Sequence, residues 1–167
     1  DRLLKYPVMD FHGGKASQIH DTVFYLRRGE IFRFDAPLAH PLGGGKTCFV
    51  MGGAMSTDKE QRVTGKSWWA QEEPNYADWD NAAKNLAAVN NRVDYVFTHT
   101  APSIIVKEMS LNSHCYIESA RIEDPVSSAL ERIQKEISYK RWYYGHFHCN
   151  WEFKKFRCIY QRIEEVR

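Results

Sequence analysis

The chain has 167 residues, of which 43% are hydrophobic, 26% charged and 14% aromatic, a balance that excludes disordered, collagen-like and coiled-coil chains. Its 23 basic and 21 acidic residues give a net charge of +2, which by itself indicates no polyanionic partner. The apolar runs are far shorter than the roughly 20 residues that a membrane-spanning helix needs. We therefore expect one folded domain that does not associate with a membrane.

Strands and loops are predicted in the first half of the chain. Residues 2–14 indicate no complete element. Residues 22–34 hold two apolar runs on either side of a short segment with Gly29, which predicts a β-hairpin. Residues 35–45, with two prolines and three consecutive glycines, predict a loop, and residues 47–51 a buried strand. Residues 54–75 show no sustained period, and a loop of that length commonly has a function.

Helices and strands follow each other in the second half. Residues 76–89 and 125–137 each place apolar side chains three and four positions apart, as one-sided helices do, and Asp124 is placed to cap the second. Residues 93–97 and 141–144 predict strands, each followed by a turn with histidine. Residues 151–166 alternate apolar and charged side chains, which is typical of half-exposed antiparallel strands. The pattern predicts an α/β fold.

The cysteines are sparse and show no CxxC pair, so they fit neither a disulfide scaffold nor a zinc ribbon with paired knuckles. None lies in a sequence typical of a catalytic nucleophile. We predict reduced thiols that pack in the interior of a cytoplasmic protein. The four residues concerned are Cys48, Cys115, Cys149 and Cys158.

Histidines follow both predicted strands, His99 after the first and His146 and His148 after the second. Ligand sites in α/β sheets gather beyond the carboxyl ends of the strands. On an extended chain, residues two apart point to the same face with backbones roughly 6.5–7 Å apart, a spacing that lets two imidazoles bind neighbouring metal ions. The alternative is that these histidines only make hydrogen bonds at a strand edge.

A second metal hypothesis takes His146, His148 and Glu152 as the two-histidine, one-carboxylate triad of oxygenases or cupins. Four residues of strand place Glu152 roughly 13 Å beyond His148, so this triad would need a sharp turn between them. That requirement makes it the weaker hypothesis. The remaining histidines stand alone in the sequence and are interpreted as surface or loop residues: His12, His20, His40 and His114.

The sequences THTAP (residues 98–102) and GHFH (145–148) resemble the last two metal motifs of the calcineurin-like metallophosphoesterases, the lone histidine and GHxH. MGGAMSTDK (51–59) and WWAQE (68–72) resemble the segment between metal motifs in a bacterial and phage branch of that family. The family's DxH, GDxxD and GNH motifs are absent, and DRLLKYP (1–7) resembles the segment directly after GNHE in that branch. The resemblance therefore implies that residues 1–167 are the C-terminal portion of a single metallophosphoesterase domain.

This resemblance implies an α/β sandwich of two mixed β-sheets flanked by helices, and a phosphatase-like hydrolysis of phosphate esters. It implies two divalent metal ions (Mn, Fe or Zn), one bound by His99 and His146 and the other by His148. Such ions clamp the phosphoryl oxygens and lower the pKa of a bound water. The remaining ligands and the leaving-group histidine belong to the missing motifs, so no catalytic residue is assignable here. We expect weak metal binding and little activity from this chain alone.

Lys59 and Arg62, in the long loop, are candidates for neutralising the substrate phosphate. The alternative for each is a surface charge or a salt bridge to Asp58 or Glu72. A competing functional hypothesis is a noncatalytic module that binds protein or nucleic acid and keeps relic histidines. Loss of the upstream strands would expose a sheet edge, which favours self-association or pairing with the missing N-terminal segment.

Overall fold

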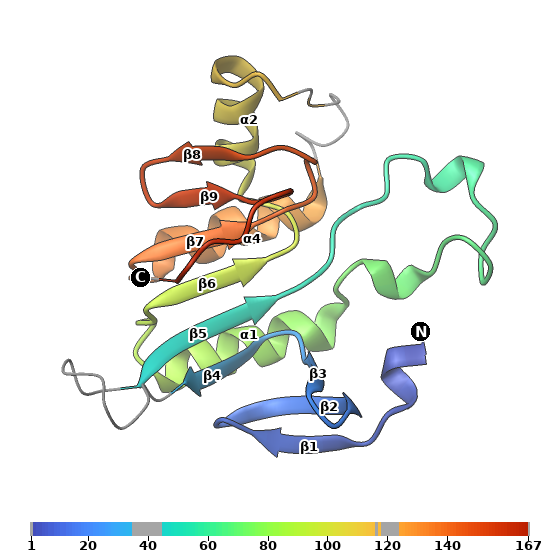
Figure 1. Cartoon of the computed structure of the whole chain (residues 1–167), viewed down its shortest axis with the longest axis vertical. Coiled ribbons are helices and arrows are strands. Elements are labelled where there is room, and N and C mark those ends of the chain that lie inside the picture. Colours follow the sequence, from blue (N-terminus) through green and yellow to red (C-terminus); the bar gives the residue numbers. More distant parts are fainter. Residues whose placement is uncertain (1, 35–44, 116, 118–123, 167) are drawn as a thin grey trace.

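The computed structural model describes residues 2–34, 45–115, 117 and 124–166, whose strands form two sheets. The larger has six strands in the order β4-β5-β6-β7-β9-β8, and the smaller has three in the order β1-β2-β3 (Figure 1). Strands β5, β6, β7 and β9 are parallel, and the edge strands β4 and β8 are antiparallel to their neighbours. The predicted α/β class is confirmed. The smaller sheet, however, is antiparallel and not mixed as expected.

The large sheet consists of β4 (Glu30–Phe34), β5 (Lys46–Met51), β6 (Tyr95–Thr98), β7 (Arg141–Tyr144), β8 (Trp151–Phe153) and β9 (Phe156–Cys158). The small sheet consists of β1 (Val8–Phe11), β2 (Gly14–His20) and β3 (Val23–Leu26). The α-helices in the described ranges are α1 (Tyr76–Ala88), α2 (Ser103–Asn112) and α4 (Pro125–Glu136). Short 3-10 turns are η1 (Arg2–Lys5), η2 (Lys59–Gln61) and η3 (Ala70–Glu72).

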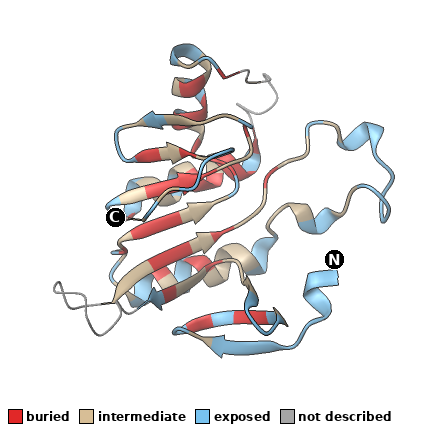
Figure 2. Cartoon of the chain, viewed as in Figure 1, coloured by how far each residue is buried: buried red, intermediate tan, exposed pale blue. Residues whose placement is uncertain are grey.

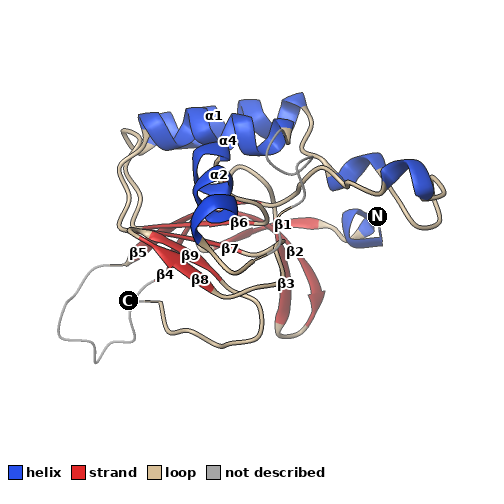
Figure 3. Ribbon diagram, turned by 90° about the horizontal axis from the view of Figure 1, so that it is seen from above, coloured by secondary structure: helices blue, strands red, loops and turns tan. Residues whose placement is uncertain are grey.

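The main core lies between the large sheet and the helices, which cover one of its faces (Figure 3). Alternate strand residues point toward the helices, and Phe49, Val96 and Trp142 among them are fully buried. Figure 2 shows buried residues along the strands of the large sheet. The other face carries a smaller cluster with Tyr95 and Tyr143 at its centre. Both faces of β5, β6 and β7 are covered, and this explains why these strands are mainly apolar runs in the sequence.

Local signals in the sequence predicted α1 and α4 well. Asn75 and Asp78 form a capping box at the start of α1, and the Asp124 carboxylate accepts a hydrogen bond from the backbone N–H of Val126 at the start of α4. Strands β5, β6 and β7 are also confirmed, with ends shifted by at most two residues. An antiparallel pair β8–β9 is present as predicted, but it ends at Cys158, whereas the alternating pattern ran to residue 166. Helix α2 was missed, because the residues just before it suggested only a polar turn broken by Pro102.

The hairpin predicted over residues 22–34 is wrong in its pairing. Both runs are strands, but β3 pairs with β2 and β4 pairs with β5, so the two belong to different sheets. Gly29, between them, has a φ of +75° and lies against α1, where an added Cβ would be 2.7 Å from the backbone nitrogen of Ala82. This close approach directs β4 under the helix and away from β3. Strands β1 and β2 were not predicted, because β2 buries small residues such as Ala16 and Ser17.

The prediction of four reduced thiols is also wrong. Cys115 and Cys149 form a disulfide, with their Cα atoms 6.0 Å apart. Their sequence separation of 34 residues gave no local signal for the bond. Cys48 and Cys158 are free and buried.

Two further sequence predictions concern a loop and the membrane. Of the loop predicted over residues 35–45, all but the last residue lie outside the described residues. Among the described helices, none has both the length and the apolar character needed to cross a bilayer.

Candidate functional site

Three parallel strands end at one edge of the large sheet, and the candidate site lies there. His99 follows β6 directly, His146 and His148 follow β7, and residues 54–75 lead from β5 to α1. The backbone N–H of Gly145 donates to the carbonyl oxygen of His99 at 3.0 Å, which joins the turns after β6 and β7. The parallel pairing of β5, β6 and β7 thus brings three separate segments together, as expected for the carboxyl end of an α/β sheet.

The GHFH segment is a turn, as the sequence indicated, so the extended-chain spacing expected for His146 and His148 does not apply. His146 and His148 have φ angles of 71° and 51°, in the left-handed region that side-chain-bearing residues rarely adopt. Phe147 between them is buried in the core, and its N–H donates to the carbonyl oxygen of Gly145 at 2.9 Å. Left-handed backbone costs about 1–2 kcal/mol per residue, and such strain is concentrated at functional sites in proteins.

His99 and His146 lie in direct contact. The Nε2 atom of His99 and the Nδ1 atom of His146 are 3.0 Å apart and form a hydrogen bond, whose donor is set by the tautomers of the two rings. Two imidazole nitrogens bound to one zinc ion at about 2.0–2.1 Å are themselves roughly 2.9–3.4 Å apart. The observed spacing therefore fits two ligands of one shared ion.

His148 lines the same pocket, of about 350 Å³, as the other two histidines. Its ring stacks on Tyr160 with the ring centres 5.0 Å apart. The remaining pocket residues come from the long loop: Ser56, Thr57, Asp58, Arg62 and Glu72. In the described part of the chain, no group of three or more histidine, cysteine or acidic side chains is arranged to hold a metal ion. The pocket thus holds one pair of imidazoles, His99 and His146, at the spacing of two metal ligands, and His148 lies apart from that pair.

The loop side of the pocket combines acidic and basic groups. The Glu72 carboxylate accepts from the Ser56 hydroxyl at 2.5 Å and from the backbone N–H of Trp69 at 3.2 Å. The Arg62 guanidinium donates through Nε to Asp58 at 2.7 Å and through Nη1 to the carbonyl oxygen of Ser67 at 3.0 Å. These bonds hold the Arg62 guanidinium beside the histidines, paired with the Asp58 carboxylate.

Of the two predicted phosphate-binding cations, only Arg62 lines the pocket. The Lys59 ammonium instead forms an ion pair with Glu73 at 3.7 Å and lies 4.8 Å from the centre of the Trp68 ring. The salt-bridge alternative therefore describes Lys59, although its partner is neither of the two carboxylates considered. Arg62 lines the pocket, as a phosphate-binding cation would, and it also forms the salt bridge to Asp58 that was the alternative.

The turn that carries His99 is held by buried hydroxyl groups. The Thr98 hydroxyl donates to the carbonyl oxygen of Thr100 and accepts from the Trp142 indole N–H at 2.7 Å. The Thr100 hydroxyl contacts that of Ser127 at 3.1 Å, and Ser127 in turn donates to the Asp124 carboxylate. Burial raises the pKa of Asp124 above its usual range, against the opposing effect of these hydrogen bonds. The helix cap of α4 thereby supports the histidine turn.

The oxygenase-type triad is not assembled. Glu152 lies on β8, where its carboxylate accepts from Arg162 at 2.7 Å and pairs with Arg157, and it does not line the histidine pocket. Sequence reasoning missed Ser56, Thr57 and Glu72, although their position after a buried strand was the available signal. Comparison with models of protein families, with curated proteins and with solved structures found no match.

Proposed function

We propose that this chain is the C-terminal portion of a binuclear, metal-dependent phosphoesterase that hydrolyses phosphate esters. The observation that carries the proposal is the 3.0 Å contact between His99 and His146, at the carboxyl ends of adjacent parallel strands. His148 lines the same pocket, so all three histidines of the resemblance face one space. The alternative role, a hydrogen bond at a strand edge, would not require three histidines at one pocket.

In this proposal His99 and His146 bind one divalent ion, and His148 binds a second. When bound, Mn, Fe or Zn ions polarise the phosphoryl oxygens and make a water molecule acidic enough to act as a nucleophile near neutral pH. Arg62 contributes a fixed positive charge that attracts and orients the ester phosphate. The carboxylate ligands that complete both shells belong to the upstream motifs of the family, so this chain alone is expected to bind metal weakly.

The proposal is tested by titrating the chain with Mn²⁺ or Zn²⁺. His146→Ala is expected to lower the affinity at least about tenfold, since even residues that only support a metal ligand are worth 10–100-fold. His20→Ala is the matched control, because His20 is exposed at the end of β2 and does not line the pocket. Equal affinity in the wild type and in the His146 and His148 alanine variants would contradict the enzyme proposal and leave the noncatalytic binding module.

Self-association is proposed as a second property, through the small sheet. β1 is an edge strand, and apolar side chains on η1 and β1 are exposed, among them Leu3 at 44% and Val8 at 55%. An open edge with apolar side chains favours pairing with a second copy. Light scattering after size exclusion is expected to give a mass that rises with concentration and falls in Val8→Lys. A monomer of constant mass over a wide concentration range would contradict it.

The cytoplasm is proposed as the location. The Cys115–Cys149 disulfide argues against this location, because disulfides are uncommon in the cytoplasm and those that occur there are usually transient. In a reducing environment the pair is therefore expected to be partly open.

A further inference from the structure

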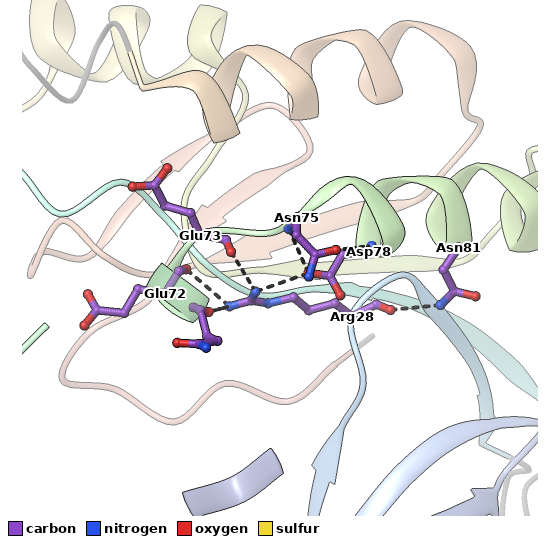
Figure 4. Close-up of polar contacts among 7 residues, drawn as sticks. Arg28, Glu72, Glu73, Asn75, Asp78 and Asn81 are labelled. Carbon is purple, nitrogen blue, oxygen red and sulfur yellow. Dashed lines mark hydrogen bonds and ion pairs between the residues drawn. The ribbon is translucent and has the colours of Figure 1, made fainter. Parts of the chain in front are cut away.

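Arg28 lies in the turn between β3 and β4, outside the pocket, and binds the segment that leads into it. Its Nη2 donates to the carbonyl oxygens of Gln71 at 2.7 Å and Glu72 at 3.2 Å, and its Nη1 donates to that of Glu73 at 3.1 Å (Figure 4). Nη1 also lies 3.4 Å from the carboxylate of Asp78, in the first turn of α1. One guanidinium thus connects three consecutive carbonyl groups with the start of a helix.

The chemistry of this contact requires an arginine. Its planar fork offers five N–H donors in fixed directions, whereas a lysine ammonium offers three donors from a single atom. The side chain is 16% exposed; its bonds to Glu72, Glu73 and Asp78 are partly buried, and its bond to Gln71 is exposed. Gly53 approaches the carbonyl group of Glu72 as well. It has a φ of +112°, and a Cβ there would lie 2.6 Å from the carbonyl oxygen of Glu72 and 3.1 Å from Nη2 of Arg28. The Glu72 carbonyl group therefore lies against both the guanidinium and the Gly53 backbone.

We call the contact of Arg28 with the carbonyl groups of residues 71–73 the Arg28 clamp. The side chain of Glu72 connects this clamp with the pocket. While its carbonyl oxygen accepts from Arg28, its carboxylate accepts from the Ser56 hydroxyl, and both Glu72 and Ser56 line the pocket with the histidines. The two ends of residues 54–75 are thereby tied to each other. Arg62 lies between these two ends of the loop, lines the pocket, and is bonded within the loop to Asp58 and Ser67.

We propose that Arg28 is a positioning residue for the anion-binding side of the pocket. It acts through the backbone of residues 71–73 and so sets where Glu72 and Arg62 stand relative to the histidines. The histidines themselves follow β6 and β7, which Arg28 does not touch. The role therefore concerns the affinity for the phosphate group and not the affinity for the metal, and this assignment rests on the proposed phosphoesterase function.

The test compares Arg28→Lys with Arg27→Lys in the whole chain. Arg27 is the matched control, because its guanidinium donates to Ser17 and Tyr6 at the small sheet. In Arg28→Lys, we expect amide hydrogen exchange across residues 54–75 to rise about tenfold, the change expected when about one charge-assisted hydrogen bond is lost. Exchange in β5, β6 and β7 should stay at the wild-type rate.

Binding of inorganic phosphate in the presence of Mn²⁺ is the second readout, expected to weaken about tenfold while Mn²⁺ affinity is unchanged. Gly53→Ala should reproduce both effects, because its added Cβ would lie 2.6 Å from the Glu72 carbonyl oxygen and 3.1 Å from Nη2 of Arg28, and so would disturb the same contact. Wild-type exchange and phosphate affinity in Arg28→Lys would overturn the proposal, as would an equal rise of exchange in all strands. A wild-type chain that binds neither Mn²⁺ nor phosphate would instead contradict the proposed function. In that case, the amide hydrogen exchange of residues 54–75 in Arg28→Lys would by itself show whether Arg28 holds this loop.

Discussion

Trp142→Ala is expected to lower the free energy of unfolding by about 3–5 kcal/mol, the range for truncating a buried aromatic side chain. Trp142 on β7 is fully buried, and its ring lies 5.7 Å from that of Phe156 and 5.4 Å from that of Tyr139. Its indole N–H donates to the Thr98 hydroxyl at 2.7 Å, one residue before His99. The substitution therefore removes both core volume and a support of the histidine turn.

Urea unfolding followed by circular dichroism measures this loss. Since domains of this kind are stable by only about 5–15 kcal/mol, Trp142→Phe is included as a milder variant that keeps an aromatic ring. Trp151→Ala is the matched control, because Trp151 is half-buried on the edge strand β8 and should cost clearly less. Equal losses for Trp142→Ala and Trp151→Ala would contradict the assignment of Trp142 to the centre of the core.

Opening the Cys115–Cys149 disulfide is expected to cost about 3–4 kcal/mol, from the chain entropy of a loop of this length. Thermal unfolding with and without a reductant measures it, and a chain of this size should lose roughly 6–16 °C of Tm. A double variant, Cys115→Ser with Cys149→Ser, should show the lower Tm already and no further change with reductant. A wild-type Tm that does not respond to reductant would contradict the prediction.

Counting thiols checks the same bond independently. Burial raises the pKa of the Cys48 thiol to about 11 and that of Cys158 to about 12, so both are expected to resist alkylation in the folded chain near neutral pH. Unfolding without reductant should expose two reactive thiols, and unfolding with it four. Because Cys149 follows His148 directly, reduction should also loosen the turn at the pocket.

The helices and strands that depend on interactions between neighbouring residues could be predicted from the sequence alone. The apolar spacing of residues 76–89 and the capping side chain of Asp124 predict α1 and α4 without reference to the rest of the chain. Apolar runs likewise predict β5, β6 and β7, and the histidines after them indicated which edge of the sheet would carry a site. The convergence of His99, His146 and His148 on one pocket agrees with that expectation, while their metal remains a prediction.

Only the tertiary structure decided which distant residues meet. The partners of β3 and β4 depend on the close approach of Gly29 to α1, and no pattern within residues 22–34 records that contact. The same holds for the disulfide across 34 residues and for Arg28, whose carbonyl partners lie more than 40 residues away. Periodicity and capping report the conformation of neighbouring residues, whereas pairing, cross-linking and clamping depend on the packing of the whole chain.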